Sequence, residues 1–210
     1  MPCAGEAIML KLRMARSAPP SEKSGESFLE GKLLIAMPGM PDPRFEKSVI
    51  FMCAHSAQGA MGLIINKPID GLSFHELVDK LGIGMKVAHS DAPILFGGPV
   101  QMGRGFVLHS ADYTSEDSTL ALTPEISLTA TVDILRAIAE GRGPEKAVLA
   151  LGYAGWGEGQ IEAEIVANGW IHCDADAGLL FDTDYASRWR SALAKLGADI
   201  SGLSAEAGRA

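Results

Sequence analysis

The sequence predicts a single compact α+β domain in which a mixed, largely antiparallel β-sheet is flanked by helices. The length of 210 residues suits one domain. Hydrophobic residues make up 47% of the chain and charged residues 21%, close to globular averages, so a real core can form. The candidate strands come in runs with helices inserted irregularly, which favours α+β over a regular βαβ repeat. The sheet could also curl into a barrel-like form.

Both ends of the chain are predicted to be flexible tails. Residues 1–27 include the stretch Ser-Ala-Pro-Pro-Ser-Glu-Lys-Ser-Gly-Glu, which has nothing to bury. Residues 198–210 are mostly small and typical of a frayed end. The folded domain is therefore expected to span residues 28–197.

The domain is predicted to begin with strands. Lys32–Met37 is apolar and stops at a Pro-Gly pair. Ser48–Ala54 and Met61–Asn66 are apolar and flank the sequence Ser-Ala-Gln-Gly, which is a hairpin signal. A slip of one residue would invert the faces of this hairpin. The expected register pairs Ala54 with Met61, Cys53 with Gly62, and Phe51 with Ile64.

A helix is expected between Ser73 and Gly82. Ser73 and Glu76 have the spacing of a capping box, and Gly82 is the glycine with which many helices end. Short apolar runs bounded by glycine or polar residues follow the helix and indicate more strands. These strands are Ile94–Phe96, and Gly105–His109 paired with Thr119–Thr123.

The second half of the domain alternates helices and strands. Thr129 or Thr131 is expected to cap a helix that Gly141 closes, with Val132, Leu135 and Ile138 on its apolar stripe. The later elements are Ala147–Leu151 (strand), Gln160–Ala167 (helix), Trp170–Cys173 (strand), Leu179–Phe181 (a further strand), and a last helix capped by Asp182 or Asp184 with the stripe Trp189, Leu193 and Leu196.

The segment Gly152–Ile165 is the most informative feature of the chain. Four glycines surround a Tyr and a Trp, and glycine costs conformational entropy wherever it is held in place. We expect a shaped surface loop whose two rings stack on a planar ligand or a partner, rather than plugs of the core. Two earlier glycine turns, Gly97-Gly98-Pro99 and Gly103-Arg104-Gly105, could offer backbone N–H groups to an anion, although simple turns explain them better. The candidate ligand-binding residues are Gly97, Gly98, Arg104, Tyr153, Gly155, Trp156 and Gly157.

Three side chains are candidates for catalysis. Cys53 and His55 lie two apart on a predicted strand and should share a face, where the imidazole could help to form a reactive thiolate. The favoured alternative is a buried cysteine that acts as a small hydrophobe, with His55 opening the turn. His109 ends a predicted strand, where polar residues often line a cleft, although a bond to a loop carbonyl is the favoured explanation.

A metal site and a cofactor are not expected. Cys53, His55, His172 and Cys173 are residue types that bind zinc. His172 and Cys173 are adjacent on a predicted strand, however, and should point to opposite faces. No Cys-x-x-Cys spacing occurs, and no Walker A loop or dinucleotide fingerprint is present.

The net charge and the cysteine content limit the expected cellular location of the protein and the classes of partner that it can bind. The formal net charge of −8 repels phosphate backbones and anionic lipid, and no Lys/Arg cluster or helix-turn-helix pattern is present. Three scattered cysteines do not make a disulfide framework, and no apolar run approaches the length of a membrane helix. We expect a cytoplasmic protein that contacts neither membrane nor DNA.

Six short blocks occur in order between Gly31 and Leu196. They are Gly31-Lys-Leu-Leu-Ile-Ala-Met-Pro, Asp42-Pro-Arg-Phe, Gly59-Ala-Met-Gly-Leu-Ile-Ile-Asn-Lys-Pro, Phe96-Gly-Gly-Pro-Val, Arg104-Gly-Phe-Val-Leu-His, and Gly152-Tyr-Ala-Gly-Trp-Gly-Glu-Gly-Gln-Ile-Glu. Together they resemble the bacterial YqgE/AlgH family. The resemblance implies a compact mixed-sheet fold in a bacterial cytoplasm and no proven activity. Members are often labelled transcriptional regulators. Ala54 stands where the family commonly has an acidic residue.

Three functions from different classes follow. The first is a binding or regulatory module that holds a small molecule or protein between the aromatic glycine segment and the Gly97–His109 region, with any effect on transcription indirect. The second is an enzyme that uses Cys53 or His109 on a small-molecule substrate. The third is a direct DNA-binding regulator, which the acidic charge disfavours. We take the first as the working hypothesis.

Overall fold

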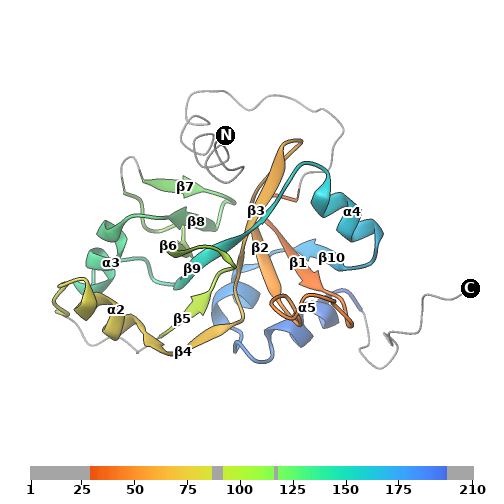
Figure 1. Ribbon diagram of the computed structural model, residues 1–210. Helices are drawn as coiled ribbons and strands as arrows, with labels where there is room; N and C mark the ends of the chain where they lie inside the picture. Colours follow the sequence, from red (N-terminus) through yellow and green to blue (C-terminus); the bar gives the residue numbers. More distant parts are fainter. Residues whose placement is uncertain (1–28, 87–91, 116–117, 198–210) are drawn as a thin grey trace, which may run out of the picture.

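A computed structural model describes residues 29–86, 92–115 and 118–197. The predicted tails, residues 1–27 and 198–210, lie outside the described residues. One ten-stranded sheet has the order β10-β1-β2-β3-β9-β6-β8-β7, with β5 added to β9 and β4 to β5 (Figure 1). The strands are β1 (Lys32–Ala36), β2 (Val49–Ser56), β3 (Gly59–Ile64), β4 (Pro68–Ser73), β5 (Pro93–Phe96), β6 (Val100–Ser110), β7 (Thr119–Ala121), β8 (Ile126–Thr129), β9 (Ala147–Trp156) and β10 (Trp170–Asp174).

The sheet is largely antiparallel because, among the strand pairs of the described residues, only β5–β9 is parallel. The predicted α+β class with a mixed, largely antiparallel sheet is confirmed. The helical elements lie on both faces of the sheet (Figure 1). They are α2 (Phe74–Lys80), α3 (Val132–Ala139), α4 (Gln160–Val166), the π-helix η2 (Gly178–Asp182) and α5 (Arg188–Lys195).

Three hydrophobic cores follow from the alternation of side chains along the strands. The main core lies on one face of the sheet, where η2 and α5 cover it, and contains Leu33, Phe51 and Phe106. The opposite face is divided into two cores. The α4 core packs Ile161 against β1, β2, β3 and β9. The α2/α3 core packs both helices over β5, β6 and β9.

The β2–β3 hairpin forms as predicted, but its register shifts within β2. Ala54 pairs with Met61, as expected, whereas Met52 pairs with Gly62. The expected partners Cys53–Gly62 and Phe51–Ile64 are therefore wrong by one residue. A β-bulge between Met52 and Ala54 inserts the extra residue, Cys53, and such a bulge leaves no periodic signal in the sequence.

The predicted pairing of Gly105–His109 with Thr119–Thr123 is also wrong. Strand β8 lies between them and pairs with both β6 and β7. Sequence reasoning missed Ile126–Thr129 as a strand because Thr129 was assigned as a possible cap of the next helix. Thr131 is the N-cap of α3, although its side chain makes no capping bond.

The predicted helix ends agree with the structure better than the predicted strand pairs do. The Ser73–Glu76 capping box is present in both directions, and Gly82 has a left-handed φ of 68° just beyond α2. Asp184 accepts N–H bonds from Ala186 and Ser187 before α5. The expected strand Leu179–Phe181 is wrong, because these residues lie in the π-helix η2. The N–H of Thr183 at its end donates to the carbonyl of Gly178.

Candidate functional site

In the glycine-rich segment, residues 152–156 form the second half of strand β9, and residues 157–159 form the turn that leads into α4. Gly152 adopts a left-handed φ of 71° and shifts the side-chain alternation of the strand by one residue. Ala150 and Tyr153 therefore both face the main core. The predicted surface loop is therefore wrong for residues 152–156, which continue the strand, while residues 157–159 form a turn at the surface.

Glycines allow two chain segments to touch beside this shift. A Cβ on Gly98 would lie 2.2 Å from the carbonyl carbon of Tyr153, and a Cβ on Gly152 would lie 2.4 Å from the carbonyl oxygen of Gly98. Gly97 N–H donates to the Leu151 carbonyl at 2.8 Å. The Gly97-Gly98 turn and the aromatic segment thus meet, as expected, but their contact is backbone packing.

Both aromatic rings of the segment are buried. Tyr153 is 2% exposed and packs edge-on against Phe106, and Trp156 is 4% exposed in the α4 core. The expectation that the rings lie on the surface is wrong, because the change in side-chain alternation at Gly152 turns Tyr153 into the main core and Trp156 into the α4 core. Gly155 pairs with Met61 inside the sheet.

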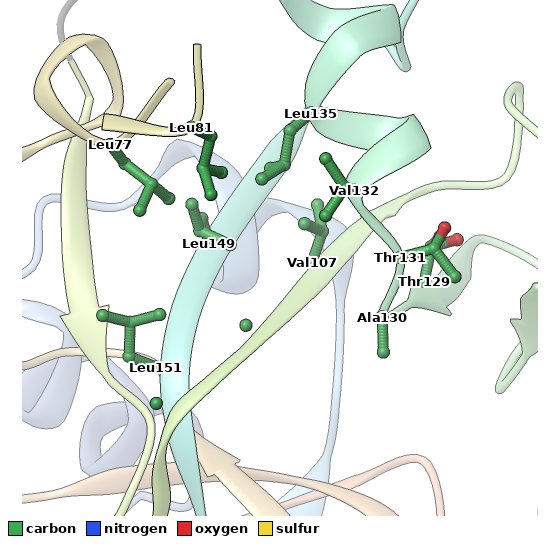
Figure 2. A pocket seen from close by; sticks show the side chains of 12 residues that line it. Leu77, Leu81, Val107, Thr129, Ala130, Thr131, Val132, Leu135, Leu149 and Leu151 are labelled. Atoms are coloured by element: carbon green, nitrogen blue, oxygen red, sulfur yellow. The ribbon is translucent and has the colours of Figure 1, made fainter. Parts of the chain in front are cut away.

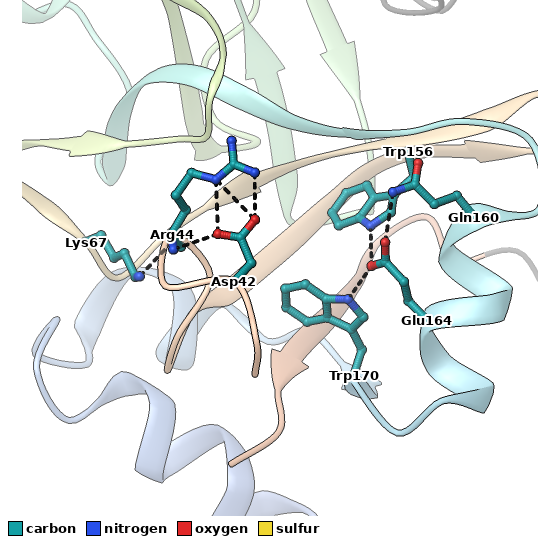
Figure 3. A network of polar contacts seen from close by, with 7 residues as sticks. All are labelled: Asp42, Arg44, Lys67, Trp156, Gln160, Glu164 and Trp170. Atoms are coloured by element: carbon teal, nitrogen blue, oxygen red, sulfur yellow. Dashed lines mark hydrogen bonds and ion pairs between the residues drawn. The ribbon is translucent and has the colours of Figure 1, made fainter. Parts of the chain in front are cut away.

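Glu164 on α4 joins two of the three tryptophans (Figure 3). Its Oε2 accepts the indole N–H of Trp156 at 3.0 Å and that of Trp170 at 2.8 Å. Gln160 donates to the other carboxylate oxygen at 2.8 Å, and Gly157 N–H donates to Gln160. One half-buried carboxylate thus satisfies two buried donors and fixes the start of α4 on the sheet.

A second polar cluster lies in the turn after β1 (Figure 3). Arg44 donates from Nε and Nη2 to the Asp42 carboxylate, and these hydrogen bonds lower the pKa of Asp42. Lys67 Nζ donates to the Arg44 carbonyl at 2.7 Å. Asn66, just after β3, accepts from Val49 N–H at the start of β2 and donates to the carbonyl of Lys47 at the end of this turn. The cluster is explained by these internal bonds.

Cys53 and His55 lie on opposite faces of the sheet. The bulge sends Cys53 into the main core, where burial raises the pKa of its thiol far above the ordinary value. His55 accepts from Leu29 N–H at Nδ1 and contacts Glu162 on α4 at Nε2, at 3.0 and 2.8 Å. The expected shared face is wrong, and the imidazole cannot activate this thiol.

His109 is completely buried on β6. Its Nδ1 donates to the Ser110 carbonyl at 2.9 Å, so Nε2 accepts from Thr129 Oγ1 at 2.9 Å. Thr129 Oγ1 also lies 2.8 Å from Thr119 Oγ1. Burial lowers the pKa of His109 and keeps the ring neutral. His109 is therefore a buried residue bonded to a backbone carbonyl, and it does not line a cleft.

Within the described residues, no three of the side chains His, Cys, Asp and Glu gather as metal ligands do. His172 is exposed and Cys173 is buried, as their adjacency on β10 requires. None of the described helices has the length and apolar character needed to cross a membrane.

A recess lies elsewhere, between α2 and α3 above β6 and β9 (Figure 2). Its volume is about 160 Å³. The walls are mostly aliphatic, and the polar atoms come from threonines at one end. The walls include Leu77 and Leu81 of α2, Val132 and Leu135 of α3, and Leu149 and Leu151 of β9.

Two glycines of β6 leave the floor of the recess open. A Cβ on Gly103 would meet no atom within 4 Å, and a Cβ on Gly105 would make ordinary contacts of 3.8 and 3.9 Å with Leu149 and Leu151. At the rim, Leu81 is 47% exposed and Val132 42% exposed. The recess is therefore an apolar site open to solvent.

The recess and the predicted site overlap only in the Gly97–His109 region. Gly103 and Gly105 flank Arg104 and line the recess. The predicted residues Tyr153 and Trp156 do not line it. Sequence reasoning missed the helix residues, since only the fold brings α2 and α3 together. The spacing Gly-Arg-Gly was the available signal, because it leaves one face of a strand without side chains.

Comparisons with known proteins agree with this fold. A family model described as AlgH-like matches residues 33–201. A UPF0301 protein of Bradyrhizobium diazoefficiens is 54% identical over 202 residues, covering 93% of this chain and 94% of that protein. A UPF0301 protein of Caulobacter vibrioides is 52% identical over 184 residues, covering 87% and 94% respectively.

Two solved structures are also similar. The solution structure of the AlgH protein from Pseudomonas aeruginosa matches with a TM-score of 0.70 at 43% identity, covering 90% of this chain and 100% of that one. A crystal structure of a Corynebacterium diphtheriae protein matches with a TM-score of 0.65 at 17% identity, covering 87% and 92%. The second likeness concerns the fold alone.

Proposed function

This chain belongs to the AlgH-like family, and from that premise we propose that it is a regulatory binding protein whose ligand places one apolar group in the recess between α2 and α3. The ligand is a small molecule or a segment of a partner protein. The protein acts by holding that ligand, and any effect on transcription is indirect.

The observation that carries this proposal is the apolar recess itself. Exposed aliphatic side chains that surround a hollow are characteristic of binding sites, because covering them removes apolar surface from water. The recess of about 160 Å³ is smaller than a typical pocket for a whole drug-sized ligand, roughly 300–1,000 Å³. It suits one side chain or a short alkyl or aromatic group.

The surroundings of Cys53 and His109 support binding over catalysis. The thiol of Cys53 is fully buried with a raised pKa, and a thiolate is the form that reacts. His109 is fully buried and both of its ring nitrogens are hydrogen-bonded. Neither group borders the recess, so neither could reach a ligand held there.

A cytoplasmic location and indirect regulation complete the proposal. The net charge of −8 opposes close approach to nucleic acid at low salt. Absence of a gel shift on duplex DNA at low salt is the expected result. A salt-dependent shift would favour the direct regulator instead.

The proposal is tested by titrating methyl-labelled protein with N-acetyl-leucine methylamide and with benzene. We expect the methyl resonances of Leu81, Val132 and Leu135 to shift, because these groups border the recess. Leu63 and Leu193, buried in the main core, provide the internal control and should not shift. No shifts with either probe, or equal shifts at the control methyl groups, would contradict the proposal.

A further inference from the structure

Thr129 connects the recess to a buried line of polar groups. It lies opposite Val107 on the paired strands β8 and β6, and both residues line the recess. Side chains directly opposite one another on paired strands lie on the same face of the sheet. Two threonines line one end of the recess (Figure 2), where Thr129 is fully buried and Thr131 is exposed at the rim. Among the lining residues, Thr129 therefore carries the buried hydroxyl.

The direction of the hydrogen bonds around Thr129 follows from the groups at the two ends of this line. The carbonyl of Ser110 can only accept, so His109 Nδ1 donates to it at 2.9 Å. The neutral ring then accepts at Nε2, and its donor is the Thr129 hydroxyl at 2.9 Å. At the other end, Thr119 Oγ1 accepts the N–H of Ser115 at 3.0 Å. Because Thr129 directs its one proton to His109, the Thr119 hydroxyl donates to Thr129 at 2.8 Å.

These bonds determine what Thr129 offers to a ligand. Its single proton points to His109, and its oxygen accepts from Thr119. The methyl group is the branch of the side chain that remains to border the recess, and the hydroxyl has no proton left to donate there. A ligand group with a hydrogen-bond acceptor would leave that acceptor unpaired beside Thr129, which costs free energy.

Resting on the proposed function, we infer that His109 is a positioning residue that determines which chemical groups the recess holds. By taking the proton of Thr129, His109 makes the recess select an alkyl or aryl group over a group of the same shape that carries an acceptor. The ligand is thus a small molecule or a peptide segment with a hydrocarbon end. The histidine acts through Thr129 and does not itself touch the ligand.

The first measurement uses the unmodified full-length protein. Long-range proton–nitrogen NMR correlations within the His109 ring report which nitrogen carries the proton. We expect the proton on Nδ1 and an unprotonated Nε2. A proton on Nε2 would force Thr129 to accept from the ring and to direct its own proton elsewhere, which would overturn the inference. This result needs no variant, so it decides the question even where a substitution of His109 prevents folding.

The second measurement compares benzene with pyridine, a ring of the same shape that carries an acceptor nitrogen. Binding is followed through the methyl signals of Leu135, which lines the recess, at a pH where pyridine is neutral. His109→Leu releases the proton of Thr129, which can then donate to pyridine. The ratio of benzene affinity to pyridine affinity should fall about fivefold, the effect of one ordinary hydrogen bond. In His109→Gln the amide can donate to Ser110 and accept from Thr129, so the original ratio should be kept.

A double variant separates positioning from a general loosening of the fold. Thr129→Val has nearly the same shape and removes the hydroxyl, so it should keep the original ratio. Added to His109→Leu, it should restore the ratio that His109→Leu lowers, because no proton remains to be released. His172→Leu, at an exposed histidine of β10, is the matched control. An unchanged ratio in His109→Leu, or a ratio that stays low in the double variant, would overturn the inference.

The same titrations distinguish this inference from the proposed function. If benzene shifts the recess methyl groups in every variant with one constant benzene-to-pyridine ratio, the inference fails and the proposed function stands. If neither benzene nor N-acetyl-leucine methylamide shifts those groups, no ligand group enters the recess, and both fail.

Discussion

At the scale of single residues, Glu164 joins parts of the fold that are far apart in the sequence. It accepts indole protons from β9 and β10 while its own helix, α4, covers the sheet between them. Two tryptophans packed edge-on at 6.1 Å are thus held by one acceptor. The sequence analysis did not single out Glu164, because its partners Trp156 and Trp170 are brought to it only by the fold.

We predict that Glu164→Ala lowers the free energy of unfolding by about 2 kcal/mol, since two buried indole N–H groups lose their acceptor. Urea denaturation followed by tryptophan fluorescence measures the loss. Glu164→Gln keeps an acceptor oxygen and should cost less, and Glu158→Ala, on an exposed residue, is the matched control. Equal stability of Glu164→Ala and the control would contradict the assigned role.

His109 predicts a pH dependence of stability. Burial lowers the pKa of its ring in the folded state, so the unfolded chain binds a proton more readily. The contribution is fully present above the unfolded pKa of about 6.5 and is lost as pH falls through the lower folded value. Unfolding measured over this range should show a smaller loss of stability in His109→Gln. An identical pH profile in the two proteins would contradict the prediction.

At the scale of elements, the sequence predicted helix caps, which depend on nearby residues, but not the pairing of strands that are far apart in the chain. The capping box of Ser73 and Glu76 depends on residues three apart, and the sequence predicted it correctly. The bulge at Cys53 depends on the partner strand β3, so the predicted register failed there. Gly152 was correctly singled out, but the sequence could not distinguish a loop from a strand with a left-handed residue.

The contact between the Gly97-Gly98 turn and β9 gives a prediction at this scale. Gly98→Ala should destabilise the protein by about 3 kcal/mol or more, because its Cβ would lie 2.2 Å from the backbone of Tyr153. Gly103→Ala, at a glycine of β6 with open space around it, is the control and should change stability little. Thermal unfolding of both variants gives the comparison. A similar melting temperature for the two would show that the close approach is not required.

At the scale of the whole molecule, composition and the succession of strands and helices along the chain predicted the α+β class. The six short sequence blocks predicted the family. The candidate site was only partly predictable. Arg104 and its two flanking glycines stood out in the sequence, whereas Leu81 and Leu135 are distant in the sequence and meet only through the packing of α2 and α3 over β6 and β9. The aromatic rings of Tyr153 and Trp156, which the sequence placed at the surface, pack instead in the main core and in the α4 core.

The most direct test of the account is to fill the recess without disturbing the fold. Gly105→Val places a side chain between Leu149 and Leu151, where a Cβ makes ordinary contacts, and Gly84→Val adds the same groups in open space away from the recess. We predict that Gly105→Val weakens binding of N-acetyl-leucine methylamide at least about tenfold. Gly84→Val should bind it like the unmodified protein. Undiminished binding by a folded Gly105→Val protein would contradict the claim that the recess is the binding site.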